Sequence, residues 1–457
     1  MAEEIKHQNE LPTVKLSLGL EGSASSAATV QLEIDRGADV LGQLTLSFED
    51  LGVHPEFDPA SFRYEEPPFR FSEHVRGDIE RMVGSALKNG PLLWLQLNPP
   101  VGHLASMPWE TMLEPVVGQV PIVRIPNFLL NSPLTVDVVD MVICLSEPKA
   151  KDPFAGAEFL RKLVPALLGL SRTELRLHIF TDAKTHSRLQ TDPSLGAFDK
   201  RVLLHDPAYL KEEGQEEKRS AADATRSVRN PWLRWIVDEM REATADVAHF
   251  VTHGYLQKGQ SALALAASPL ENKDPLWAHF IGPGELAAFL DQLGAWSVGF
   301  TSPPFNFSSL GLRQFFDDVA RLRAGPVLHH EASGDGATDE LASAYADLFL
   351  GQAPAFRRTV SMYAHPGLFV ESESPVSMSS SVADTLVTKW LDEPATVSAE
   401  DSVWTTSTQR YLEQTVARMF PVEVKPESHI QKAAADGVAQ ALKFVNEVLS
   451  KHAEVDT

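Results

Sequence analysis

The sequence is very poor in cysteine. Cys144 is the only one among 457 residues, which excludes a disulfide within the chain and fits a reducing compartment. No apolar run approaches the roughly 18 residues of a membrane-spanning helix. The polar start, Met1–Lys6, lacks the apolar stretch of a signal peptide. We therefore expect a cytoplasmic protein without a membrane partner.

Basic residues are also scarce. The chain has 62 acidic and 40 basic residues, a formal net charge of −22, and phosphate backbones are bound by clustered Lys and Arg. A nucleic-acid partner is therefore not expected. Neither the GxxxxGK[ST] loop nor GxGxxG occurs. The adjacent His329 and His330 should point to opposite faces of a strand. We accordingly expect no nucleotide, no metal and no other cofactor.

The remaining composition is that of a globular protein, with 43% hydrophobic and 22% charged residues. Between Val14 and Phe48, three stretches alternate apolar and polar residues, a pattern typical of half-buried antiparallel strands. Residues 1–60 are therefore predicted to form an N-terminal β unit. This unit either completes the core of the following domain or serves as a separate binding module.

Residues 61–135 form a predicted accessory part, and residues 136–370 an α/β part in which strands and helices alternate. Strands are predicted at 92–97, 120–125, 138–145, 175–180, 246–252, 296–301 and 326–330, and helices at 73–88, 157–170, 231–243, 285–293, 312–323 and 340–350, with a short helix after Pro108. This alternation predicts an α/β fold with a mostly parallel sheet flanked by helices.

Two segments lie outside this alternation. Residues 211–229 are dense in charge and are predicted to be a solvated insertion or a mobile linker. Residues 371–457 start with a serine-rich connector, and two stretches of helical period follow, so we predict a C-terminal helical extension. No repeat period is visible.

The most informative pattern is a pair of apolar runs with polar ends. The first run ends at His253-Gly254, and the second ends at Ser302-Pro303 about fifty residues later. Caspase-type cysteine peptidases place the catalytic histidine at this distance before the cysteine, at the carboxyl ends of neighbouring strands. In this chain the position of the cysteine is taken by Ser302 or Pro303. The pattern indicates a peptidase scaffold without its usual nucleophile.

Three segments resemble the CHAT domains, caspase-related peptidases often found beside tetratricopeptide repeats. His249–Gly254 resembles the histidine motif of that family. The strand at 92–97 followed by Leu104–Glu110 resembles its Pro-Trp-Glu segment, and Ala324–Val327 resembles a downstream strand entry. The likeness covers residues 72–369. It implies a caspase-like fold, a protein or peptide partner, a preference for a basic residue before the scissile bond, and a role in prokaryotic defence or signalling.

Peptide hydrolysis by this family requires a thiolate, a base and donors for the oxyanion. By the resemblance, His253 would be the base, and its other interpretation is an ordinary hydrogen-bonded histidine. Gly254 would offer its N–H to the oxyanion, or would be a turn glycine. Glu147 and Asp182 follow strand ends and are candidates for a groove that receives a basic side chain. Ser302 would be a weak nucleophile, because a serine hydroxyl needs a closely aligned base.

Two functions remain open from the sequence. The first is a CHAT-like pseudopeptidase that binds or regulates a protein partner, with Cys144 as a thiol in the core. The alternative is an active cysteine endopeptidase whose nucleophile has been replaced at or near Ser302. The prolines at 303 and 304 favour the first, because they make the whole loop unusual and not one residue only. The oligomeric state is left open.

Overall fold

The computed structural model describes residues 11–19, 29–36, 39–53, 69–87, 92–98, 101–126, 136, 138–148, 154–170, 174–192, 200–208, 228–240, 244–257, 260–270, 278–303 and 306–369. The chain divides into two compact units, Met1–Glu371 and Ser372–Thr457. The predicted C-terminal extension and nearly all of the charged insertion lie outside the described residues.

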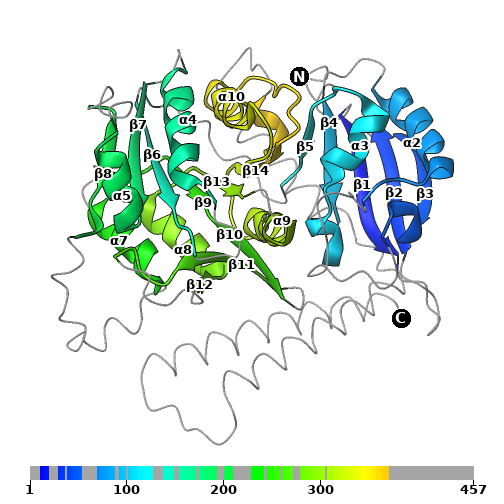
Figure 1. The fold of residues 1–457 in the computed structure, drawn as a ribbon. Helices are drawn as coiled ribbons and strands as arrows, with labels where there is room; N and C mark the ends of the chain where they lie inside the picture. The colour runs from blue at the N-terminus through cyan, green and yellow to red at the C-terminus, as the bar shows by residue number, and fades with distance from the viewer. Residues whose placement is uncertain are drawn as a thin grey trace, which may run out of the picture. The chain divides into compact units, whose positions relative to one another are not determined.

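A twelve-stranded sheet organises the first unit, in the order β3-β2-β1-β4-β5-β15-β14-β13-β9-β6-β7-β8 (Figure 1). Its first strands along the chain are β1 (Pro12–Gly19), β2 (Thr29–Arg36), β3 (Asp39–Ser47), β4 (Leu93–Leu97) and β5 (Ile122–Arg124). The others are β6 (Val138–Leu145), β7 (Glu174–Thr181), β8 (Val202–His205), β9 (Val247–Val251), β13 (Ser297–Ser302), β14 (Val327–Glu331) and β15 (Val360–Tyr363). From β8 to β14 all neighbours are parallel, which confirms the predicted α/β class.

The N-terminal strands belong to this same sheet. β1, β2 and β3 pair antiparallel as the alternating pattern predicts, and their buried residues include Val30, Leu32 and Ile34 on β2. β1 also pairs in parallel with β4. The N-terminal strands therefore extend the main sheet, and their buried residues form a third core with β4 and the two helices that begin at Glu73 and Trp109.

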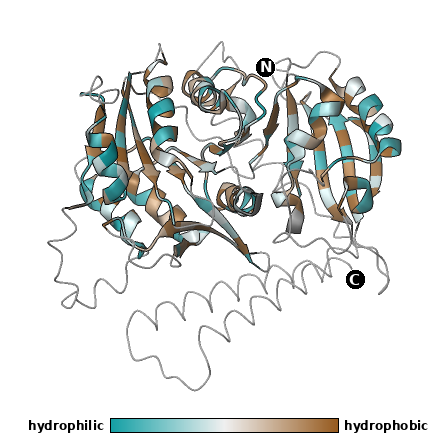
Figure 2. Ribbon diagram, viewed as in Figure 1, coloured by the Kyte–Doolittle hydropathy of each residue, from teal (hydrophilic) through white to brown (hydrophobic). Residues whose placement is uncertain are grey.

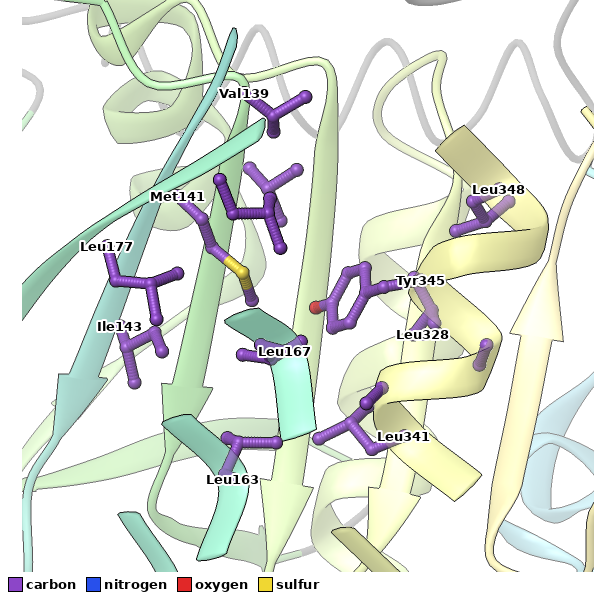
Figure 3. Close-up of a cluster of buried hydrophobic side chains, with 14 of the residues drawn as sticks. Val139, Met141, Ile143, Leu163, Leu167, Leu177, Leu328, Leu341, Tyr345 and Leu348 are labelled. Carbon is purple, nitrogen blue, oxygen red and sulfur yellow. The ribbon is translucent and has the colours of Figure 1, made fainter. Parts of the chain in front are cut away.

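Helices cover both faces of the sheet. Their bounds are α2 (Glu73–Ala86), α3 (Trp109–Val117), α4 (Gly156–Leu168), α5 (Ala183–Gln190), α7 (Pro231–Glu239), α8 (Pro283–Leu293), α9 (Asn306–Ala320) and α10 (Ala337–Leu350). One core lies between the sheet, α4 and α10, where Met141, Leu167 and Tyr345 meet (Figure 3). A second core lies under α7, α8 and α9. Figure 2 shows hydrophobic residues along the central strands between these layers.

A second, three-stranded antiparallel sheet was not predicted. It consists of β10 (His253–Gln257), β11 (Gln260–Ala266) and β12 (Ala278–Ile281). Two side chains fasten β11 to the carboxyl edge of the main sheet: Ser146 Oγ accepts the N–H of Ala266 at 2.8 Å, and Thr252 Oγ1 donates to Ala264 O at 2.7 Å. The alanine-rich β11 carries little β propensity of its own, so its conformation depends on these contacts.

The helix predicted at 312–323 begins earlier, at Asn306, as α9. Its first turn contains Ser308 and Ser309, and serine competes with helix formation in local sequence rules. α9 therefore starts only a few residues after the end of β13, which brings its first turns next to the predicted site.

Candidate functional site

The predicted site lies where β9 and β13 end. These strands are parallel neighbours with Val251 opposite Thr301, and the N–H of Thr252 donates to Thr301 O at 3.2 Å. Ser302 is the last residue of β13, and His253 follows β9 after one residue. The backbone thus places the ends that carry His253 and Ser302 side by side, at the carboxyl edge where parallel sheets hold their ligands.

Ser302 is turned into the protein. It is 0% exposed, and its hydroxyl donates to the carbonyl oxygen of His330 on β14 at 3.4 Å. Its own carbonyl accepts the N–H of Ala332 at 3.0 Å, and Pro303 is buried as well. In this geometry the Ser302 hydroxyl is not presented to a substrate carbonyl.

His253 is the first residue of β10 and pairs with Ala264 of β11. Its ring is half-buried, and burial lowers its pKa to about 4. The imidazole is therefore neutral at pH 7 and is a weaker base than an exposed histidine, whose pKa lies near 6.5.

Gly254 has a packing role that the sequence did not reveal. Its N–H donates to the hydroxyl of Ser308 on α9 at 2.8 Å. A Cβ at position 254 would lie 2.3 Å from the Ser308 carbonyl oxygen, and one on Gly311 would lie 2.6 Å from the Tyr255 nitrogen. Two glycines thus let helix and strand backbones touch. The amide expected to hold an oxyanion is already engaged by Ser308.

The two acidic candidates both contact helix starts. Glu147 Oε1 accepts the N–H of Gly156 at 2.7 Å where α4 begins. Burial, together with the charge of Asp182, raises the Glu147 pKa to about 6. Asp182 caps α5, accepting the N–H groups of Lys184 and Thr185 at 3.0 Å. These contacts give both residues a structural role, and their predicted place in a substrate groove stays a prediction.

A buried polar network lies behind the site, on the α10 side of the sheet. His249 Nδ1 is 2.8 Å from the Tyr345 hydroxyl, and His249 Nε2 is 2.8 Å from Thr301 Oγ1. Thr301 Oγ1 is in turn 3.0 Å from His330 Nδ1. Burial lowers the pKa of His249 to about 3 and that of His330 to about 4, so both rings stay neutral. Gly299 makes room, since a Cβ there would lie 2.1 Å from the Tyr345 oxygen.

Charged side chains close the α9 side. Glu331 on β14 lies opposite Ser302 in register. Its carboxylate accepts hydrogen bonds from Ser309 and Arg313 of α9. The first turns of α9 are thus tied to β14 as well as to β10. His329 faces α9, where its ring lies 5.9 Å from that of Phe316, in agreement with the expected opposite orientations of the two neighbouring histidines.

The Pro-Trp-Glu segment forms a buried ionic centre. Trp109 is fully buried and donates to Leu104 O at 2.7 Å. Glu110 accepts two hydrogen bonds from Arg124, at 2.7 and 2.9 Å. The neighbouring carboxylate raises the pKa of the Arg124 guanidinium, and the guanidinium lowers the pKa of Glu110, both against the effect of burial. Arg124 also lies 5.4 Å from the centre of the Phe316 ring, which links this segment to α9.

The single cysteine is not part of the site. Cys144 lies in the core beneath α7, and burial raises its pKa well above the usual value for a thiol. A thiol in this state is protonated and inaccessible. Among the described residues, no group of three or more His, Cys, Asp or Glu is placed to hold a metal ion. None of the described helices has the length and apolar character to span a membrane.

Fold and site together define an α/β protein with a mostly parallel sheet and a second small sheet over its carboxyl edge. No family model, no curated protein and no solved structure matches the chain.

Proposed function

We propose that this chain is a CHAT-like pseudopeptidase: it binds a protein partner without cleaving it, as a binding or regulatory component of a prokaryotic defence or signalling system. One observation carries the proposal. The Ser302 hydroxyl is buried against the His330 carbonyl, while the backbone places it beside the strand that leads to His253. This proximity supports the scaffold of a nucleophile–base pair, and both candidates for the nucleophile position, Ser302 and Pro303, are buried.

The neighbouring contacts support the same conclusion. Acyl transfer needs a donor aimed at the developing oxyanion, and the Gly254 amide donates to Ser308 instead. The base is weakened as well, since burial lowers the pKa of His253 to about 4. Loss of a nucleophile alone commonly costs several orders of magnitude in rate. A binding role requires none of these three groups.

The experiment restores the missing sulfur. Ser302→Cys, the parent chain and His253→Ala are incubated with peptides containing Lys or Arg, and cleavage is followed by mass spectrometry. We expect no turnover from any of them, because a sulfur at 302 would face the His330 carbonyl inside the protein. A Cys144→Ser background serves as the control that assigns any activity to position 302.

The same experiment tests the alternative function, an active peptidase whose cysteine has been replaced. Turnover by Ser302→Cys that disappears in the Ser302→Cys/His253→Ala double variant would establish that alternative. For the binding role, a partner isolated with the chain should be recovered at full length. His253→Ala should leave its affinity within a few-fold, because binding does not use the base.

A further inference from the structure

The small sheet carries an aromatic pair on the face that is turned away from α9. Residues paired directly across antiparallel strands share a face, as do residues two apart on one strand. His253 pairs with Ala264, and Ala264 pairs with Phe280. Tyr255 and its partner Ala262 belong to the same face. We call Tyr255, Ala262, Ala264 and Phe280 the aromatic face, and His253 marks its inner end.

The two rings on this face meet above the middle strand. Tyr255 on β10 and Phe280 on β12 have ring centroids 4.5 Å apart and planes tilted by 37°. They come from strands separated by β11, whose residues on this face are Ala262 and Ala264. Because both are alanines, the rings can lean across β11 and touch. The two rings therefore form one aromatic surface above the two alanines.

The outer part of this face is open to solvent although it is apolar: Tyr255 and Ala262 are half-buried, and Ala264 is buried. Phe280 is 52% exposed, whereas the opposite face of the sheet holds the fully buried Leu263 and Ile281. An exposed aromatic cluster on a soluble surface is typical of a binding site, because aromatic side chains dominate binding hot spots. The row from Phe280 through Ala264 leads to His253, so this face reaches the carboxyl edge of the main sheet where His253 and Ser302 lie.

The negative net charge of the chain favours a partner with basic side chains. The chain has a formal net charge of −22, so its long-range field attracts basic segments and repels acidic ones. Aromatic rings present negative π faces, and a guanidinium over such a face gains roughly 0.5–1 kcal/mol at an exposed site. Arginine combines both properties, since it is always charged and its planar group stacks on rings.

We propose that the aromatic face binds an extended peptide segment of a protein partner by stacking an arginine of that segment on Tyr255 and Phe280. This inference rests on the proposed function and assigns the surface through which the partner is held. The segment lies along the small sheet toward His253. It is held without any covalent step.

The test measures the affinity of a fluorescein-labelled Thr-Val-Arg-Val-Thr peptide for the full chain by fluorescence polarisation. Two further probes replace its arginine with leucine or glutamate. We expect the order arginine, leucine, glutamate, with the arginine preference reduced at high salt. Phe280→Ala should weaken binding of the arginine probe by several-fold to about tenfold. Tyr255→Leu, which keeps an apolar side chain, should weaken it similarly.

Leu322→Ala is the matched control, because Leu322 is also a large apolar residue with 52% exposure. It should leave the affinity unchanged. The proposal is overturned if the arginine probe does not bind, if the arginine and glutamate probes bind equally, or if Phe280→Ala binds as the parent chain does. Self-association that depends on Phe280 in sedimentation would assign the face to a second copy and would also overturn it. None of these outcomes involves turnover, so they are distinct from a failure of the pseudopeptidase proposal.

Discussion

The Nδ1 atom of His178 lies 3.2 Å from the Nε2 atom of His205, with the ring planes 22° apart. The far nitrogens face carboxylates: His178 Nε2 is 3.3 Å from Asp140, and His205 Nδ1 is 3.3 Å from Glu239. This chain of contacts ties the edge strand β8 and the helix α7 to β6 and β7. Since the ring centroids are 5.5 Å apart, the rings meet edge to edge. Two imidazole nitrogens that bind one metal ion in line are separated by roughly 4 Å. The separation of 3.2 Å is therefore that of a hydrogen bond between the rings.

The pH dependence of stability should report on this pair. Burial lowers the pKa of both histidines, and Arg176 adds to the effect at His178, while Asp140 and Glu239 act in the opposite direction. Because the folded values are lowered, the unfolded chain takes up protons first as the pH falls. The pair therefore stabilises the fold above the ordinary histidine pKa, and this contribution is lost as the pH falls through the folded values.

We expect the free energy of unfolding, measured with urea, to decrease between pH 7.5 and 5. In His205→Gln that decrease should be smaller. It should not vanish, because burial also lowers the pKa of His249, His253 and His330. The control His279→Gln changes an exposed ring and should keep the parent slope. An unchanged slope in His205→Gln would contradict the assignment.

Gly254→Ala should destabilise the protein strongly. The added methyl would lie 2.3 Å from the Ser308 carbonyl oxygen and 2.4 Å from the Leu312 nitrogen, both backbone atoms that cannot give way without moving α9. We expect a loss of about 1–3 kcal/mol or more in denaturant unfolding.

The matched control is Gly84→Ala in α2, where an added Cβ meets nothing within 4 Å. Alanine is the better helix former there, so this change should stabilise the protein by about 0.5–1 kcal/mol. Equal effects of the two substitutions would show that α9 does not touch β10 in solution.

Removal of one partner from the Glu110–Arg124 pair should be costly. Arg124 is fully buried and also lies over the Phe316 ring, so Glu110→Gln removes the carboxylate that pairs directly with its charge inside the protein. We expect Glu110→Gln to lower the free energy of unfolding by about 3–5 kcal/mol. Asp78→Asn breaks the exposed Asp78–Arg81 pair and should cost under about 0.5 kcal/mol. Similar losses from both would mean that the buried pair is solvated.

Tyr345→Phe should disturb the network behind the site without emptying the core. It removes the hydroxyl that lies 2.8 Å from His249 Nδ1 and keeps the ring. A buried polar atom that loses its partner costs about 1–3 kcal/mol. The ¹⁵N chemical shifts of the His249 ring should change in the same variant, most of all at Nδ1, which faces the removed hydroxyl. Tyr255→Phe, which removes a hydroxyl that donates to Gln257 at 3.0 Å in an exposed hydrogen bond, should affect neither measurement.

Local pattern was enough to predict most of the fold. The strand predicted at 138–145 has those bounds in the structure. The helices predicted before residue 371 appear with shifted ends as α2, α3, α4, α7, α8, α9 and α10, whereas α5 was not predicted. The small sheet was missed because β12 has four residues and β11 is mostly small residues. β15 was missed for a similar reason, since its four residues gain their place only by pairing between β14 and β5.

The proximity of the two strand ends followed from the sequence, whereas the burial of Ser302 and the hydrogen bond of the Gly254 amide did not. Two apolar runs about fifty residues apart predicted that the ends carrying His253 and Ser302 would be neighbours. The burial of Ser302 depends on its turn toward His330, and the engaged Gly254 amide depends on Ser308, 54 positions along the chain. His249 and Tyr345 are 96 positions apart. Contacts of this kind arise from tertiary packing, which no local pattern encodes.

Helix α9, which accepts the Gly254 amide through Ser308, contributes side chains to two separate cores. Leu310 packs with the N-terminal strands and α3, while Leu312 and Phe315 pack beneath the central strands. A ligand that separated Ser308 from Gly254 would have to move α9, and this movement would disturb both cores. The contact between Gly254 and Ser308 and the core of the N-terminal strands therefore share one helix.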